Sequence, residues 1–224
     1  MNNSIRPYLF DAVNLIKSNI SLLLIPTIIA FTPYLFLISS NKALGNALSI
    51  VSRLLLVVIY PLIYGKFIAI INGISTVSWG QLFILHWWNY FIVKIVLYIP
   101  ILFIVFINFL FHLGINLLVG IASAVIDILA IYIFPIIFIE YLRLPSIPLG
   151  VKCLFGNFKF SLPLIFISIL PILFLLLPNN PSPISEISLY QFLSALPQWI
   201  FAIVVDFTVF ITASLILKDK LYRN

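Results

Sequence analysis

The stretch that decides the fold is LLVGIASAVIDILAIYIFPIIFIE at residues 117–140, in which Asp127 is the single charge before Glu140. A helix needs about 20 predominantly apolar residues to cross roughly 30 Å of hydrocarbon. This stretch exceeds that length and carries one charge within it. It therefore predicts a helix that spans a membrane.

The composition extends the same conclusion to the whole chain of 224 residues. Hydrophobic residues make up 63% of it and charged residues 8%, against about 45–50% and about 25% in an ordinary globular protein. A soluble domain this poor in charge could not cover its own surface. We therefore expect a single integral membrane domain over residues 1–224. Two histidines, one cysteine and six carboxylates leave few places for a catalytic site.

Six apolar stretches meet the length of a membrane span, so the expected fold class is an all-α polytopic membrane bundle. Short breaks rich in Ser, Asn, Gly and Pro separate them, as is typical of loops. The predicted spans are 20–39, 48–72, 90–111, 117–140, 160–178 and 193–217.

The distribution of cations predicts the orientation of these spans. With six spans and a cytoplasmic N-terminus, only Lys42 and Arg53 of the 12 cations fall on the outer side. Lysine and arginine concentrate in cytoplasmic loops of membrane proteins. The sequence thus predicts a multi-pass protein of the cell (inner) membrane with both termini in the cytoplasm. The cations expected inside are Arg6, Lys17, Lys66, Lys94, Arg143, Lys152, Lys159, Lys218, Lys220 and Arg223.

Similar amphipathic segments precede the first, third and fifth spans, at 12–19, 82–89 and 150–157. Each ends in asparagine, a residue suited to capping or turning a chain. We expect three tandem helical hairpins, each led into by a short helix on the cytoplasmic surface and angled to the span that follows. Coincidence among apolar helices is the alternative explanation.

These lead-in segments, together with the loop SWGQLF at 78–83, resemble a loose group of prokaryotic six-helix membrane proteins of unknown function. The group is related to the membrane domain attached to some glycerophosphodiester phosphodiesterases. The resemblance implies the six-helix arrangement for most of the chain. It implies no catalytic residues, because the phosphodiesterase chemistry of that group belongs to a separate soluble domain.

Three charged residues fall deep within the predicted spans, away from their inner ends, namely Arg53, Asp127 and Asp206. Ionisable groups inside a membrane are costly and are functional candidates by default. At 1.5 Å per residue the two aspartates lie within roughly 3 Å in depth and could share a site. They would form either a proton- or cation-handling pair or a structural network in which Arg53 neutralises one carboxylate.

At the inner boundary of the membrane, Lys66 and Glu140 occupy equivalent positions in two similar stretches, YPLIYGK at 60–66 and FPIIFIE at 134–140. We expect them to form a structural ion pair. Lys94 is expected either to join this pair or to extend toward the interface.

No motif for a metal, a phosphate-binding loop or a catalytic nucleophile is present. His86 and His112 fall at opposite membrane faces and cannot share a metal. The aromatic residues Trp79, Trp87, Trp88, Tyr90 and Trp199 are interpreted as an interfacial belt.

The sequence therefore predicts a protein that is not an enzyme and that uses no cofactor. We expect a membrane helper, scaffold or transport-associated component. The alternative is a proton- or cation-coupled transporter using Asp127 and Asp206. The expected partners are the lipid bilayer and another membrane protein, without nucleic acid, and the sequence leaves the oligomeric state open.

Overall fold

The computed structural model describes residues 4–38, 42–74, 76–111, 116–176 and 189–221, and every regular element within them is a helix. His112 and the segment 179–188 therefore lie outside the described residues. The elements are α1 (Arg6–Ser18), α2 (Ile20–Ile38), α3 (Lys42–Ile71), α4 (Trp79–Leu82), the π-helical turn η1 (Phe83–Trp87), α5 (Trp88–Phe111), α6 (Asn116–Glu140), α7 (Ser146–Gly156), α8 (Phe158–Leu176) and α9 (Leu189–Leu221).

The helical membrane bundle predicted from the sequence is confirmed. Among the described residues, four helices are long and apolar enough to span a membrane, at Ala43–Ile71, Trp79–Asn108, Leu118–Glu140 and Leu196–Lys220. Two further pairs pass the same test but are bent, α1 with α2 by 72° and α7 with α8 by 104°. Counting each bent pair as one span gives up to six.

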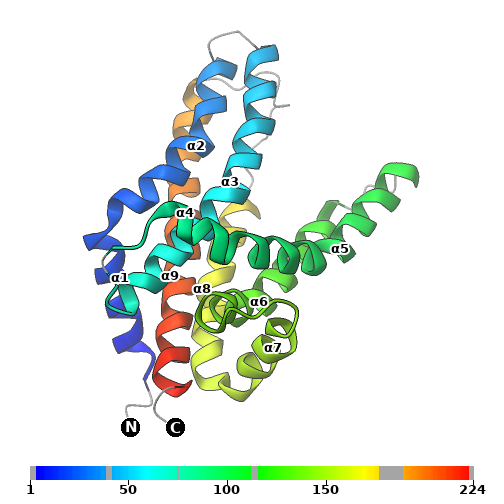
Figure 1. Ribbon diagram of the computed structural model, residues 1–224. Coiled ribbons are helices and arrows are strands. Elements are labelled where there is room, and N and C mark those ends of the chain that lie inside the picture. The colour runs from blue at the N-terminus through cyan, green and yellow to red at the C-terminus, as the bar shows by residue number, and fades with distance from the viewer. Residues whose placement is uncertain (1–3, 39–41, 75, 112–115, 177–188, 222–224) are drawn as a thin grey trace.

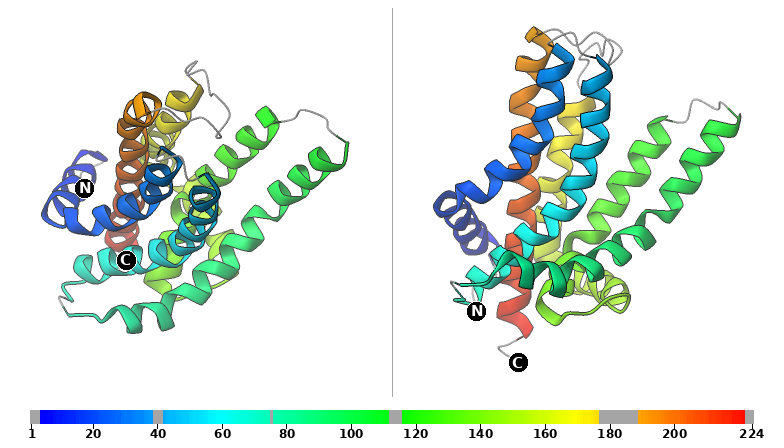
Figure 2. Two further views of the ribbon diagram at one scale, coloured as in Figure 1. Left: turned by 90° about the horizontal axis from the view of Figure 1, so that it is seen from above. Right: turned by 45° about the horizontal axis from the view of Figure 1, so that its top comes forward.

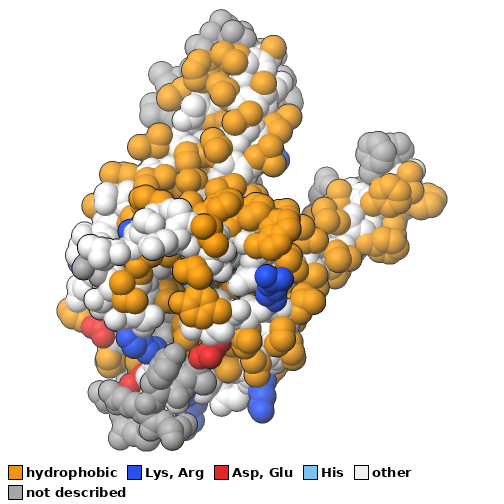
Figure 3. Space-filling model, in the orientation of Figure 1, with side chains coloured by type: hydrophobic (Ala, Val, Ile, Leu, Met, Phe, Trp, Pro, Cys, Tyr) orange, Lys and Arg blue, Asp and Glu red, His pale blue; other side chains and the backbone are white. Residues whose placement is uncertain are grey.

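Helix α1 begins and α9 ends at the same end of the bundle, which we call the terminal end (Figure 1). Helices α2, α3, α8 and α9 run side by side, whereas the α5–α6 hairpin leans away from them at the opposite end (Figure 2). Most of the charged side chains visible in Figure 3 lie toward the terminal end, and hydrophobic side chains cover the rest of that face. This distribution fits a bundle whose apolar length lies in lipid.

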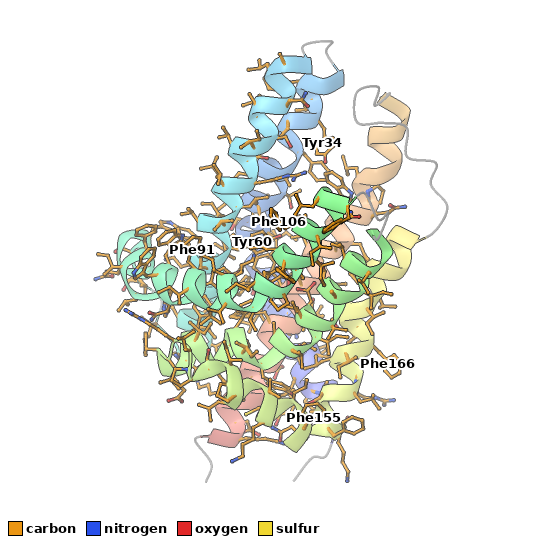
Figure 4. The ribbon with its side chains drawn as sticks, turned by 90° about the vertical axis from the view of Figure 1, so that its right-hand side faces the viewer. Tyr34, Tyr60, Phe91, Phe106, Phe155 and Phe166 are labelled. Atoms are coloured by element: carbon orange, nitrogen blue, oxygen red, sulfur yellow. The ribbon has the colours of Figure 1, made fainter. Side chains whose placement is uncertain are left out.

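The centre of the bundle is an aromatic core contributed by α3, α6 and α9. The rings of Tyr64 and Phe210 are stacked with their centroids 4.0 Å apart, and Phe67, Phe138 and Phe207 are also buried. Figure 4 shows Tyr60 near the middle of the bundle. Close ring packing of this kind stabilises helix contacts in lipid, where the hydrophobic effect between helices is weak.

Two asparagines make the sharp bends between the lead-in helices and their spans. Asn19 (φ −126°, ψ 34°) and Asn157 (φ −111°, ψ 35°) end α1 and α7 in nearly the same backbone conformation. Their carbonyl oxygens then accept the first hydrogen bonds of the next helix, from Leu22 N at 2.9 Å and from Phe160 N at 2.8 Å. Each asparagine thus closes one helix and opens another, which is why the chain turns there.

Helices α1 and α7 lie against protein on one side rather than only on lipid. Ala12 and Ile16 of α1 are buried, and α1 packs on α9 while α7 packs on α6. Gly150 permits the second contact, since a Cβ atom at this position would lie 2.7 Å from the Ile133 backbone nitrogen. The opposite face of α7 carries the exposed Phe155, which points away from the bundle in Figure 4.

The middle lead-in segment differs from the other two, and the prediction that it is angled to its span is wrong. Ser78 and Gln81 form a capping box that starts α4, after which α4, η1 and α5 form one continuous span. Asn89 lies inside this helix, where it donates to Leu85 O at 3.3 Å and accepts from Arg143 Nε at 2.6 Å. The helix continues through Asn89 into α5, and no sharp bend forms there. The three-hairpin repeat stays a prediction.

Candidate functional site

A cavity of about 440 Å³ lies inside the bundle, with walls from α3, α5, α6, α8 and α9. Its polar wall brings together Asp127, Asp206 and Lys94. Both aspartates lie near the middle of their spans, so the cavity is surrounded by apolar helix on both sides. The expectation from depth that the two carboxylates could share a site agrees with this placement.

Each carboxylate is held by one tyrosine from a neighbouring helix. Tyr64 on α3 donates its hydroxyl hydrogen to Asp206 Oδ2 at 2.6 Å, and Tyr98 on α5 donates to Asp127 Oδ1 at 2.5 Å. The second oxygen of each carboxylate receives no hydrogen bond from the described residues. One acceptor on each aspartate is therefore left for a proton or a bound molecule.

One face of α5 supplies the other polar groups. Tyr90, Lys94 and Tyr98 follow at intervals of four, which places them on one side of a helix. Lys94 Nζ donates to the Tyr90 hydroxyl at 3.2 Å and lies 5.3 Å from the centroid of that ring. Its charge attracts both carboxylates, while the carboxylates repel each other. Lys94 therefore offsets one of two negative charges.

The side chains of both aspartates are exposed although they lie near the middle of their spans, and both line the cavity. Tyr64 and Tyr90, in contrast, are buried at 3% and 2% exposure. Tyr64 and Tyr90 thus form the buried part of the site and the carboxylates its exposed part.

An aromatic layer closes the cavity toward the terminal end. Tyr64 packs there against Phe138 (5.8 Å), Tyr90 (6.1 Å) and Phe210 (4.0 Å). On the far side of Phe138, His86 packs at 4.8 Å.

A second cavity, of about 420 Å³, lies beyond this layer and is lined by Gly65, His86 and Tyr141 among others. Tyr64 lines the first cavity and its neighbour Gly65 lines the second. Gly65 leaves space for His86, since a Cβ atom there would lie 3.0 Å from His86 Cδ2. One layer of side chains therefore separates the two cavities.

A third cavity, of about 230 Å³, adjoins the first on the side away from the terminal end. The two share Tyr60, Pro171 and Ala202 as walls. Three cavities thus follow one another along α3, with the carboxylates in the middle one.

Arg53 lies elsewhere. It is eleven positions from Tyr64 along α3, or about 16 Å along the helix axis, and its charge acts on Tyr34 of α2. Among the described residues, neither carboxylate is paired with Arg53. The depth of Asp206 matches that of Tyr64, which explains why tyrosine and not arginine holds it.

Lys66 and Glu140 are also placed apart from this site. The Lys66 amine donates to the Val77 carbonyl and lies 5.1 Å from the centroid of the Trp79 ring. Glu140 is exposed, and the described residues include no ion pair between the two. Lys66 instead ties the end of α3 to the start of the next lead-in segment.

The sequence analysis did not identify the residues that line the central cavity beside the two aspartates. Tyr90 was assigned to the interfacial belt but lines the cavity, and Lys94 lies with it rather than at the inner boundary. The available signal was the four-residue spacing of Tyr90, Lys94 and Tyr98, which places polar groups on one face of an apolar helix. Trp199 packs between helices, with its ring 4.6 Å from that of Tyr34.

No protein-family model, curated protein or solved structure matches the chain. The resemblance to prokaryotic six-helix membrane proteins therefore stays a prediction. Within the described residues, no three His, Cys, Asp or Glu side chains gather into a cluster that could hold a metal ion.

Proposed function

We propose that the protein is a proton- or cation-coupled membrane transporter whose central site is the Asp127–Asp206 cavity. One observation carries the proposal: two carboxylates and a lysine line a single cavity in the middle of apolar spans. Ionisable groups at this depth mark ion and proton pathways in membrane proteins. Substrate and coupling-ion sites of transporters typically lie near the bilayer midplane.

The order of the cavities supports the same function. The second and third cavities lie on either side of the central one along the bundle, and the aromatic layer with Tyr64 and Phe138 separates the central cavity from the second. A transporter needs a central site that opens to one side at a time. In this proposal the aromatic layer closes the path toward the terminal end.

Proton flux into proteoliposomes tests the proposal. The purified protein is reconstituted with an internal pH-sensitive dye, and a membrane potential is imposed. We expect flux above that of protein-free liposomes for the wild type, and near that background for Asp206→Asn and Asp127→Asn. Glu140→Gln is the matched control, because it removes an exposed carboxylate from the same helix as Asp127 and should leave the flux unchanged.

The helper or scaffold role expected from the sequence predicts the opposite result. Flux equal to that of protein-free liposomes, or equal in the wild type and both asparagine variants, would overturn the transporter proposal. Co-purification of a stable membrane protein partner under those conditions would favour the helper role.

The proposal includes the orientation expected from the cations, with both termini in the cytoplasm. Cys153 on α7 is the single cysteine and is half-buried. A membrane-impermeant maleimide should label it only after the cells are permeabilised. Labelling in intact cells at the same rate would reverse the orientation.

A further inference from the structure

The rings around the two carboxylates make the central cavity aromatic as well as acidic. Tyr60, Tyr64, Tyr90 and Phe134 line it, with Tyr60 and Tyr64 centroids 5.9 Å apart and those of Tyr90 and Phe134 4.9 Å apart. The face of an aromatic ring attracts cations, especially in a desolvated site. Aromatic rings and carboxylates in one wall therefore both favour a positively charged ligand.

The charges in the cavity do not balance. Lys94 carries one positive charge, whereas Asp127 and Asp206 together carry two negative charges when ionised. An uncompensated charge in an apolar environment is costly. A monovalent cation, or a proton in its place, removes the imbalance.

The construction of the cavity favours an organic cation over a divalent metal ion. Ca²⁺ requires about six to eight oxygen ligands at 2.3–2.6 Å, whereas each aspartate here has one oxygen already bonded to a tyrosine. The volume of about 440 Å³ falls within the roughly 300–1,000 Å³ range of small-molecule pockets. Apolar walls suit a weakly hydrated ammonium group with alkyl substituents.

We propose that the cavity binds a small monovalent organic cation, a quaternary or protonated amine, with its charged nitrogen between Asp127 and Asp206 and against the Tyr60 ring. The inference rests on the proposed function, because it names the substrate class of the same site. Lys94 neutralises the remaining carboxylate, and the tyrosine hydroxyls hold both carboxylates in position. The proton and the organic cation then compete for the same pair of aspartates.

Binding of choline to the purified full-length protein in detergent, measured by isothermal titration calorimetry, tests the substrate class. The control ligand is 3,3-dimethylbutan-1-ol, which has the same shape as choline with carbon in place of the charged nitrogen. We expect choline to bind about tenfold more tightly than this neutral analogue. This comparison uses the wild type alone and does not depend on any variant folding.

Two substitutions at Tyr60 separate the contribution of the ring from that of its hydroxyl. Tyr60→Phe keeps the aromatic face and should bind choline as the wild type does. Tyr60→Leu keeps an apolar side chain without that face and should bind about fivefold more weakly. Asp206→Asn should weaken choline binding by about tenfold and leave binding of the neutral analogue unchanged.

Equal affinity for choline and its neutral analogue, or equal choline binding by Tyr60→Phe and Tyr60→Leu, would overturn the inference. The proton flux assay distinguishes this failure from that of the proposed function. Flux that depends on Asp206 together with equal binding of the two ligands would leave the transporter proposal intact and reject the substrate class. Absence of both flux and choline binding would reject both.

Discussion

Helices α9 and α5 are both long and apolar, yet they meet different surroundings. In the apolar stretch of α9, 61% of residues are buried within the protein, against 17% in that of α5. Helix α9 packs on α1, α6 and α8, whereas beyond its continuation into η1 the main neighbour of α5 is α6. Hydrophobicity alone therefore does not tell a helix that faces protein from one that faces lipid.

The polar face of α5 turns toward the densely packed side of the molecule. Tyr90, Lys94 and Tyr98 line the central cavity, while Leu102 and Phe103 on α5 are 60% and 62% exposed. The cavity thus lies where a loosely held helix meets a tightly packed core. Of the helices that line the cavity, α5 is loosely packed, so its movement would alter the cavity with little loss of packing.

The largest loss of stability is expected where α7 packs on α6. Gly150→Ala would place a methyl group against the Ile133 backbone, which cannot move aside as a side chain does. We expect a loss of about 3 kcal/mol in the free energy of unfolding, measured by SDS titration of the protein in detergent micelles.

Gly156→Ala is the matched control for this substitution, because it lies on the same helix and a Cβ atom there would meet no atom within 4 Å. Equal stability of the two variants would show that α7 does not pack closely on α6.

The next effect compares the packed core with α5 directly. Ile211 on α9 is fully buried, whereas Leu102 on α5 is 60% exposed. Ile211→Ala removes dispersion contacts and should cost about 2 kcal/mol, while Leu102→Ala should change stability by no more than about 0.5 kcal/mol. The same unfolding titration measures both. A cost for Leu102→Ala as large as that for Ile211→Ala would mean that α5 packs against protein in the detergent-solubilised state.

A smaller effect is expected at the two tyrosine–aspartate contacts. Tyr64 is buried, whereas Tyr98 is only partly so. Leaving a carboxylate without its donor costs more in a drier environment. We expect Tyr64→Phe to destabilise the protein by about 1 kcal/mol more than Tyr98→Phe does, as read from the two unfolding curves. A larger loss of stability for Tyr98→Phe than for Tyr64→Phe would mean that the Asp127 contact, and not the Asp206 contact, is the more deeply buried.

The spans were predictable from the sequence because length and hydropathy alone define them. The predicted span 117–140 corresponds to α6 at Asn116–Glu140. The predicted span 20–39 corresponds to α2 at Ile20–Ile38, which is long enough to span a membrane only together with α1. The bends at Asn19 and Asn157 also follow from local chemistry, since an asparagine can end one helix and start another. Asn89 has the same local sequence signal, but its bond to Arg143 depends on a segment 54 residues away.

The depth of the two aspartates could be predicted from the sequence, but the side chains that hydrogen-bond to them could not. Counting residues along each span placed Asp127 and Asp206 at a similar depth, and both residues line the central cavity. Their hydrogen-bond donors depend on which helices are neighbours and how each is rotated, and uniformly apolar spans carry little information about either. Tyrosine at a membrane helix end is also typical of the interface, which concealed the role of Tyr90.

Two of the lysines that the sequence analysis places on the cytoplasmic side form hydrogen bonds between helices at the terminal end. Lys218 Nζ donates to the last carbonyl of α3, that of Ile71, at 2.6 Å, and Lys220 donates to the side chain of Asn157. Positive charge near a helix C-terminus is favourable because carbonyls there lack partners. The same residues that indicate orientation in the sequence thus also fix helix ends in the structure.

The most direct test of the account is whether Asp127 and Asp206 face one cavity. In a Cys153→Ser background, Asp127→Cys and Asp206→Cys are combined and treated in membranes with a short bifunctional methanethiosulfonate reagent. We expect the two cysteines to be bridged within one chain, as detected by mass spectrometry, while a control pair of Asp206→Cys with Glu140→Cys is not. Failure to bridge the first pair when each single cysteine reacts, or equal bridging in both pairs, would contradict a shared central cavity.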